Sequence, residues 1–201
     1  MTEGQALAGA GYSAPQPQRD RALGFWFYLI SDAILFAVLF ANYAVLLGGT
    51  AGGPTGADLF TMWRVAAETA LLLTSSLSFG LMNYAALSGK KPAALCWLAV
   101  TIALGVAFLA LELGEFAAMA AQGATPQRSG FLSGFFALVG AHGLHVSFGL
   151  AMLAALFVQI MAKGLTHPVL SRLYRVGLFW HFLDLIWVGI FSFVYLPGLL
   201  S

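Results

Sequence analysis

The sequence predicts an all-α, polytopic membrane protein built as a bundle of five transmembrane helices. Its composition is 60% hydrophobic and only 8% charged, with a mean hydropathy of +0.87, whereas a soluble domain carries about 25% charged residues. Five apolar stretches are each long enough to cross about 30 Å of hydrocarbon as a helix. Any open structure would leave backbone polar groups unpaired in lipid. We therefore expect a bilayer to be the solvent of this chain.

A polar segment precedes the first apolar stretch. Residues 1–22 are rich in Gly, Ala, Pro and Gln and have too little apolar content to offset the entropy of ordering, so we expect a mobile cytoplasmic segment. The apolar run that begins near Phe25 is longer than the core of a signal peptide, which indicates a retained anchor. Residues 23–201 are then expected to form a single membrane domain.

Sequences typical of turns separate the five stretches. Breaks rich in Gly, Pro or Lys lie at residues 48–56, 88–92, 123–130 and 163–175. These connections are too short to hold a soluble domain, so consecutive helices are expected to be antiparallel neighbours. The predicted spans are 25–47, 62–87, 93–119, 131–161 and 176–200.

The basic residues predict the orientation. Cytoplasmic loops of membrane proteins carry an excess of Lys and Arg, so the side of the bundle with more of these residues is expected to face the cytoplasm. The amino terminus lies on that side, and five spans then place the carboxyl terminus in the periplasm. The richer side holds Arg19, Arg21, Lys90, Lys91, Lys163, Arg172 and Arg175, and the other side holds Arg64 and Arg128.

Charge and cysteine content exclude several classes of function. The formal net charge is +1 and the basic residues are scattered, so no nucleic-acid partner is indicated. Cys96 is the single cysteine, and it has no second Cys with which to form an internal disulfide or a metal-binding pair.

Small residues recur at four-residue steps on two of the predicted helices. Membrane helices pack closely through such residues, so we expect both stripes to face other helices. The stripes are Ala66, Ala70, Thr74 and Ser78 on the second helix and Gly143, Ser147, Ala151 and Ala155 on the fourth.

Ionisable residues inside the spans are the candidate functional residues, because each is costly in lipid unless it has a function or an inward-facing partner. Their depth, counted along each helix, predicts two polar layers. A central-to-cytoplasmic layer holds Asp32, His142, His145, His181 and Asp184, and a layer toward the external side holds Glu68, Glu112 and Glu115.

Three interpretations of these residues remain open. Histidines on facing helices can ligate a metal or a haem, which would make the chain a stand-alone cytochrome with two His ligands. Chains of Asp, Glu and His also serve as proton or solute paths, although the inverted repeats and broken helices of transporters are absent from the sequence. The residues by themselves favour a third interpretation, in which hydrogen bonds between helices fix the geometry of the bundle.

Two stretches are more specific than this physical pattern. Residues 142–149 read HGLHVSFG and residues 180–187 read WHFLDLIW, with ISDAILF at 30–36 and ELGEF at 112–116 in the same order. The chain thereby resembles subunit III of the haem-copper respiratory oxidases from Phe25 to Gly198. Its five-span form, with the loop at 51–56 and the helix entry at 128–133, is similar to the subunit III of cytochrome bo-type ubiquinol oxidases.

The resemblance implies a supporting subunit of a bacterial inner-membrane complex for aerobic respiration. The family's subunit III holds no catalytic, cofactor-binding or metal site. The haems and copper lie in subunit I, which reduces oxygen to water and pumps protons. The expected partners are subunit I, subunits II and IV, and membrane phospholipids, and the expected contribution is to sustain proton uptake. Only the complex would then be an enzyme, a ubiquinol oxidase; the alternative within the family is a cytochrome c oxidase.

Structural or lipid-proximal roles for the ionisable residues also follow from the resemblance. Asp32 stands where mitochondrial-type subunits III have a buried Glu that reacts with carbodiimides, and its shorter side chain departs from that pattern. We expect Asp32 and His181, with His145 as a further candidate, to form a hydrogen-bonded cluster that joins the first, fourth and fifth helices.

Overall fold

The structure, a computed structural model, describes residues 16–200. It divides within its first helix, α1 (Gln16–Leu46), into a part that ends at Leu35 and a part that begins at Phe36, and each is described by itself. Most of the predicted mobile segment 1–22 lies outside the described residues, and residues 16–22 form the first turns of α1. The single membrane domain expected for residues 23–201 stays a prediction.

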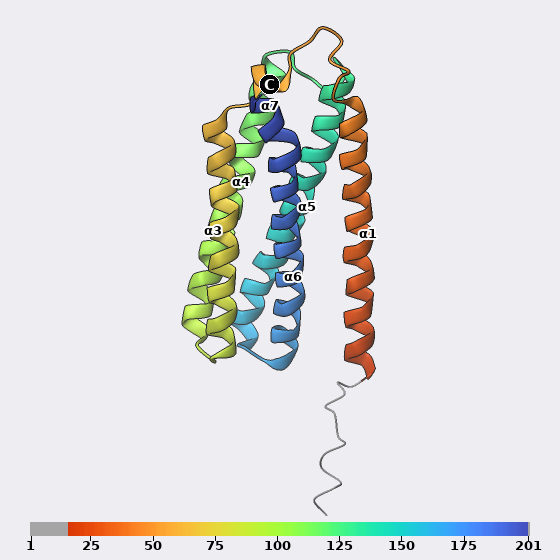
Figure 1. The fold of residues 1–201 in the computed structure, drawn as a ribbon. Coiled ribbons are helices and arrows are strands. Elements are labelled where there is room, and N and C mark those ends of the chain that lie inside the picture. Colours follow the sequence, from red (N-terminus) through yellow and green to blue (C-terminus); the bar gives the residue numbers. More distant parts are fainter. Residues whose placement is uncertain (1–15, 201) are drawn as a thin grey trace, which may run out of the picture. The chain divides into compact units, whose positions relative to one another are not determined.

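Five helices are long and apolar enough to cross a membrane, as the sequence predicts: Leu23–Leu46, Met62–Leu87, Lys91–Ala121, Gly130–Lys163 and His167–Leu199. The chain is a multi-pass membrane protein. In its second part, α3 (Met62–Leu87), α4 (Lys91–Ala121), α5 (Gly130–Lys163) and α6 (His167–Ile190) lie side by side (Figure 1). The remaining elements are the short helix α2 (Gly56–Leu59), the π-helical turn η2 (Phe191–Tyr195) and α7 (Leu196–Leu200).

Local sequence explains where these helices begin and end. Ser129 precedes α5 in an extended conformation, and its side chain accepts a hydrogen bond of 3.2 Å from the backbone N–H of Leu132. Gly164 follows α5 with φ of 69°, a left-handed conformation that glycine adopts without a steric penalty. Proline stands in the first turn of both α4 and α6, where its missing N–H is harmless.

The predicted fourth loop, residues 163–175, is wrong, because α6 already begins at His167. Hydropathy excluded the first turns of this helix because they carry polar residues such as Arg172, which is exposed. With η2 and α7, α6 continues to Leu199 as a span of 33 residues, about 50 Å long at 1.5 Å per residue. The polar first turns therefore extend the helix beyond the hydrocarbon layer.

Hydrogen bonds between side chains join α6 to α3 and α3 to α4. The indole N–H of Trp180 donates to Ser75 Oγ at 3.1 Å, and that of Trp187 donates to Thr69 Oγ1 at 3.1 Å. Within lipid such bonds add to van der Waals packing, because bulk water is not there to compete. A hydrogen bond of 2.7 Å between the hydroxyls of Ser78 and Thr101 makes the corresponding link from α3 to α4.

The two small-residue stripes do not pack within the chain along their whole length. On α3, Ser78 is buried but Ala66, Ala70 and Thr74 are exposed. On α5, Gly143 is buried, Ser147 is half-buried, and Ala151 and Ala155 are exposed. A four-residue step drifts around an α-helix by about 40° each time, so a long stripe leaves the buried face that it starts on.

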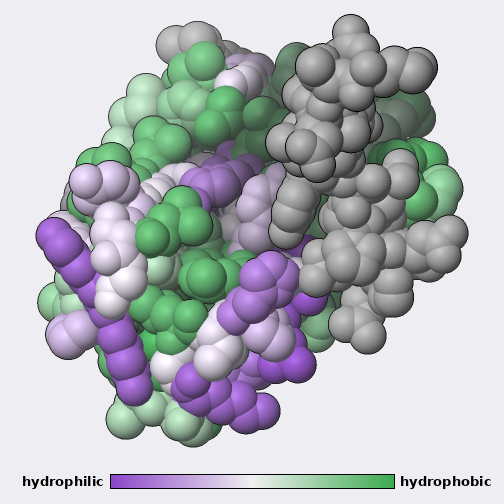
Figure 2. Space-filling model, turned by 90° about the horizontal axis from the view of Figure 1, so that it is seen from below, coloured by the Kyte–Doolittle hydropathy of each residue, from purple (hydrophilic) through white to green (hydrophobic). Residues whose placement is uncertain are grey.

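Basic residues gather at one end of the second part, where the α3–α4 and α5–α6 connections lie. Figure 2, viewed toward this end, shows hydrophilic side chains there against a largely hydrophobic molecule. The two connections are also tied together, because Lys91 Nζ donates to the carbonyl of Met161 at 3.0 Å. This end holds Lys90, Lys91, Lys163, Arg172 and Arg175, whereas Arg64 and Arg128 lie toward the other end.

Candidate functional site

Three glutamates meet in the interior of the second part. Glu68 comes from α3 and Glu112 and Glu115 from α4, and their exposed fractions are 0%, 1% and 3%. Each carboxyl group lies close enough to the other two to interact with them electrostatically. The three residues that the sequence assigned to one layer are therefore brought together, and we call Glu68, Glu112 and Glu115 the carboxyl cluster.

Two further side chains complete the carboxyl cluster. The hydroxyl of Tyr195 is fully buried and donates a hydrogen bond of 2.9 Å to Glu115 Oε2. Arg64, on α3, is the cation that interacts electrostatically with both Glu68 and Glu115. Sequence reasoning missed both of these residues as members of the site.

The position of Tyr195 depends on the π-helical turn η2. A π turn is a local insertion in a helix and is frequent at functional sites. Hydropathy carries no information about hydrogen-bond register, but Pro197 is a usable signal. Proline has no N–H to donate to the carbonyl four residues earlier, so regular α-helical bonding must be interrupted near this point.

The carboxylate of Glu112 lies directly against the backbone of α5 at Gly143. A Cβ atom added to Gly143 would be 2.7 Å from Glu112 Oε1. Neither carboxylate oxygen of Glu112 has a hydrogen-bond partner, and the same holds for Glu68. Glycine at position 143 is therefore what allows α5 to approach the carboxyl cluster.

His142 lies next to this contact and is fully buried. Its ring packs against Trp187 and Phe108, with centroids 5.4 Å and 5.9 Å away, and neither ring nitrogen has a hydrogen-bond partner. The predicted layer for His142 is wrong, because it neighbours Gly143 and so lies near the level of Glu112. Counting from the helix ends misplaced it, since both α4 and α5 extend beyond a membrane-spanning length.

His145 is only half-buried, one turn further along α5. Its Nδ1 is 2.7 Å from the carbonyl oxygen of Ala141, and its ring centroid is 5.1 Å from that of Phe36. The rings of both histidines thus pack against aromatic side chains, His142 against Trp187 and Phe108 and His145 against Phe36.

His181 and Asp184 form a second polar group, on the outer side of α6. Nδ1 of His181 lies 2.6 Å from Ser76 Oγ on α3 and 3.6 Å from Asp184 Oδ2. The side chain of His181 is 49% exposed, whereas that of Asp184 is 10% exposed. We call His181, Asp184 and Ser76 the histidine group.

Asp32 belongs to the first part of the structure. The hydroxyl of Tyr28, one turn earlier on α1, donates a hydrogen bond to its carboxylate. The expected cluster of Asp32 with His181 joins residues of the two separately described parts, and it stays a prediction.

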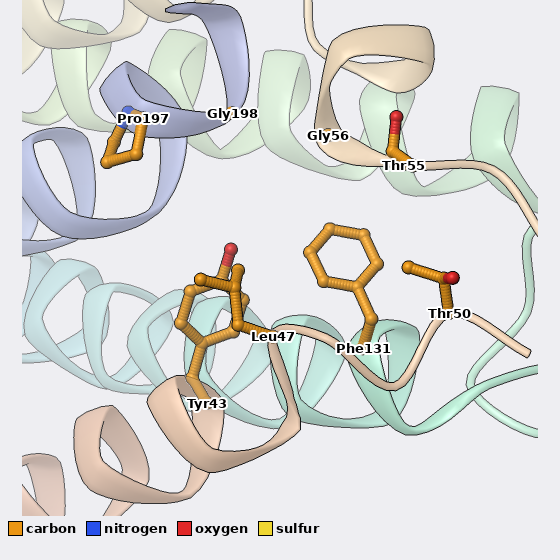
Figure 3. Close-up of a pocket in the computed structure, with 8 residues that line it drawn as sticks. All are labelled: Tyr43, Leu47, Thr50, Thr55, Gly56, Phe131, Pro197 and Gly198. Atoms are coloured by element: carbon orange, nitrogen blue, oxygen red, sulfur yellow. The ribbon is translucent and has the colours of Figure 1, made fainter. Parts of the chain in front are cut away.

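An apolar hollow of about 280 Å³ lies at the end of the second part opposite the basic residues. Figure 3 shows the side chains of Tyr43 and Phe131 directed toward it, with α7 across from them. The polar side chains in its wall are few. The lining residues are Tyr43, Leu47, Thr50, Thr55, Gly56, Phe131, Pro197 and Gly198.

The arrangement of donor side chains does not form a metal site. Among residues 16–200, no group of three or more His, Cys, Asp or Glu side chains could hold a metal ion. Six of the polar side chains instead form two groups, the enclosed carboxyl cluster and the histidine group with its exposed His181. In this part of the chain no cofactor site is evident.

Comparison with known proteins identifies the family. Residues 6–199 match the family described as cytochrome c oxidase subunit III. The chain belongs to the cytochrome c oxidase subunit III family. It is 53% identical to cytochrome bo(3) ubiquinol oxidase subunit 3 of Pseudomonas putida over 89% of this chain and 86% of the relative.

Two further relatives show the range of the family. The ubiquinol oxidase subunit 3 of Pseudomonas aeruginosa is 51% identical over 90% of this chain and 87% of its own length. A cytochrome c oxidase subunit 3 from Alkalihalophilus pseudofirmus is 42% identical over 90% of this chain and 88% of its own length. Family membership therefore covers proteins named for two different electron donors.

Proposed function

We propose that this chain is the non-catalytic subunit III of a proton-pumping haem-copper ubiquinol oxidase. The observation that carries the proposal is 53% and 51% identity to two ubiquinol oxidase subunits across about nine-tenths of the chain. Enclosure of the carboxyl cluster and the aromatic packing of His142 support a structural role. The haems and copper would then belong to subunit I, with subunits II and IV as the other partners.

The distribution of charge supports a cytoplasmic amino terminus and a periplasmic carboxyl terminus. Lys and Arg accumulate on the cytoplasmic side of membrane proteins. The connections α3–α4 and α5–α6 carry most of the basic residues of the second part. This orientation places the carboxyl cluster nearer the periplasmic side.

Two apolar hollows support phospholipid binding. One is the hollow of Figure 3, and the other is a groove of about 530 Å³ between the end of α1 and α6. Small side chains of α1, among them Ala37, Ala41 and Ala44, line the groove opposite Phe193. Both have the size and apolar character that suit an acyl chain, and bound lipid there would hold the subunit in the complex.

The experiment that tests the proposed function is purification of the complex in mild detergent, followed by assays of oxygen consumption. Ubiquinol is expected to support rapid turnover, and reduced cytochrome c is not. Complexes stripped of this chain are expected to lose activity faster during turnover, which measures the support given to proton uptake. Turnover with reduced cytochrome c and not with ubiquinol would favour the second candidate function, subunit III of a cytochrome c oxidase. The relative from Alkalihalophilus pseudofirmus, named as a cytochrome c oxidase subunit 3, is the observation that favours this candidate.

A further inference from the structure

His181 is an ionisable side chain that is exposed within the apolar part of α6. It stands six residues after Arg175, about 9 Å along the helix, and 18 residues, about 27 Å, before the end of the span. This is the hydrocarbon region for either orientation of the chain. The side chain is nevertheless 49% exposed, whereas Glu68, Glu112 and His142 are at most 1% exposed.

The inner edge of the imidazole ring is already fixed. Nδ1 lies 2.6 Å from Ser76 Oγ and 3.6 Å from Asp184 Oδ2, and the ring of Phe79 packs at 87° to the imidazole plane. Ser76 and Phe79 belong to α3, and Asp184 lies one turn further along α6. Nε2 is therefore the polar atom on the exposed side of the ring, and among the described residues of the second part it has no hydrogen-bond partner.

Lipid is a poor cover for this atom. Acyl chains have no hydrogen-bonding groups, and the headgroups lie about 15 Å from the centre of a hydrocarbon layer about 30 Å thick. Polar side chains within spans accordingly face protein or a water-filled cavity. An oriented imidazole in this position is therefore expected to meet a polar group from outside the second part of the chain.

The surface beside His181 is shaped for close approach by a helix. A hollow of about 120 Å³ runs between α3 and α6, lined in part by Gly80, Asn83 and Tyr174. A Cβ added to Gly80 would meet nothing within 4 Å, so this glycine opens outward and does not serve packing inside the chain. Small residues at such positions are what membrane helices use to bring their backbones together.

We propose that the α3–α6 face around His181 is the docking site for a transmembrane helix of another oxidase subunit, whose hydrogen-bonding side chain meets Nε2 of His181. The inference rests on the proposed function, because it requires that the chain belong to an oxidase complex. Gly80 admits the partner's backbone, and the exposed side chains of Leu185 and Val188 supply the apolar contact around the imidazole.

A photo-reactive amino acid at position 185 tests this proposal in the intact complex in its native membrane. Leu185 is 69% exposed and lies one turn from His181. Val106 on α4 is the matched control, because it is 52% exposed and lies in the middle of its own span. Crosslinks from position 185 to a transmembrane peptide of another oxidase subunit are expected, with at least a fivefold higher yield to that peptide than from position 106.

Substitution of His181 provides the second measurement. H181L removes the hydrogen-bonding group, whereas H181Q keeps one. Because the side chain at position 181 is exposed, neither substitution is expected to disturb packing inside the chain. The fraction of the crosslinked subunit retained after a detergent wash is expected to fall severalfold in H181L and much less in H181Q.

The outcomes separate this inference from the proposed function. If haem-containing subunits copurify with the chain but position 185 crosslinks only to lipid or to a second copy of the chain, the docking site is wrong and the proposed function stands. Equal retention in H181L and H181Q also overturns the docking site. If no oxidase subunit copurifies, both proposals fail.

Discussion

Ionisable side chains within a membrane span are unfavourable unless they have partners, and the carboxyl cluster and the histidine group differ in where those partners lie. Glu68, Glu112 and Glu115 are enclosed by the helices of the chain itself, with Tyr195 as a buried donor. His181 has its inner nitrogen bound to the chain and its outer nitrogen open. This difference underlies our proposal that the carboxyl cluster serves the fold of this subunit, whereas the histidine group serves its assembly with another.

Two glycines give the sharpest test of that difference. G143V places side-chain atoms where a Cβ alone would be 2.7 Å from Glu112 Oε1, so we expect a loss of about 1–3 kcal/mol in stability. G80V adds atoms into open space and should leave the stability of the chain nearly unchanged. Thermal unfolding in detergent measures both.

In the assembled complex, G80V should have the larger effect of the two variants on retention of the neighbouring subunit. G80V is expected to reduce retention of the neighbouring subunit, because valine occupies the space through which its helix approaches. A G80V complex as robust as the wild type, together with a G143V chain of unaltered thermal stability, would remove the distinction between the enclosed and open regions.

Tyr195 offers a smaller test of the enclosed region. Y195F removes the donor to Glu115 Oε2 and leaves a buried carboxylate oxygen without a partner, which should cost about 1–3 kcal/mol. Y84F is the control, because Tyr84 is 71% exposed and near the end of α3. Chemical denaturation of both variants should show a lower midpoint for Y195F alone; equal midpoints would mean that the bond is not stabilising.

Ser76 gives the smallest expected effect, in the open region. S76A removes the hydroxyl that holds Nδ1 of His181, so the imidazole should reorient with a stability change of at most about 1 kcal/mol. S192A, also on the outer side of the last span, is the control. Retention of the neighbouring subunit should fall in S76A and not in S192A; the opposite order would show that the orientation of His181 is irrelevant.

Hydropathy predicted the five spans well because crossing a bilayer requires about 20 apolar residues whatever the surrounding structure. It failed at the start of α6, where polar residues occupy helical turns that extend beyond the apolar stretch. Depth counting grouped the three glutamates correctly and misplaced His142, since helix ends that overhang the membrane shift the count. Exposure of Ala66 and Ala70 likewise depends on where α3 meets its neighbours, which a four-residue pattern does not contain.

The members of the site that the sequence missed are side chains that become important only through tertiary contacts. Tyr195 reaches Glu115 from 80 positions away along the chain, and a π turn that hydropathy does not report directs it inward. Ser76 is one of several hydroxyl residues on α3, and only its contact with His181, 105 positions away, distinguishes it. Family motifs predicted His181 and Asp184 but not the surface that they form with α3.

A reduced-minus-oxidised absorbance spectrum of the purified complex, recorded before and after this chain is stripped away, shows which subunit holds the haem. The full haem signal is expected to stay with a larger subunit, and the released chain is expected to be colourless. If the released chain keeps haem, its histidines are ligands and the chain is a cytochrome in its own right, not a supporting subunit.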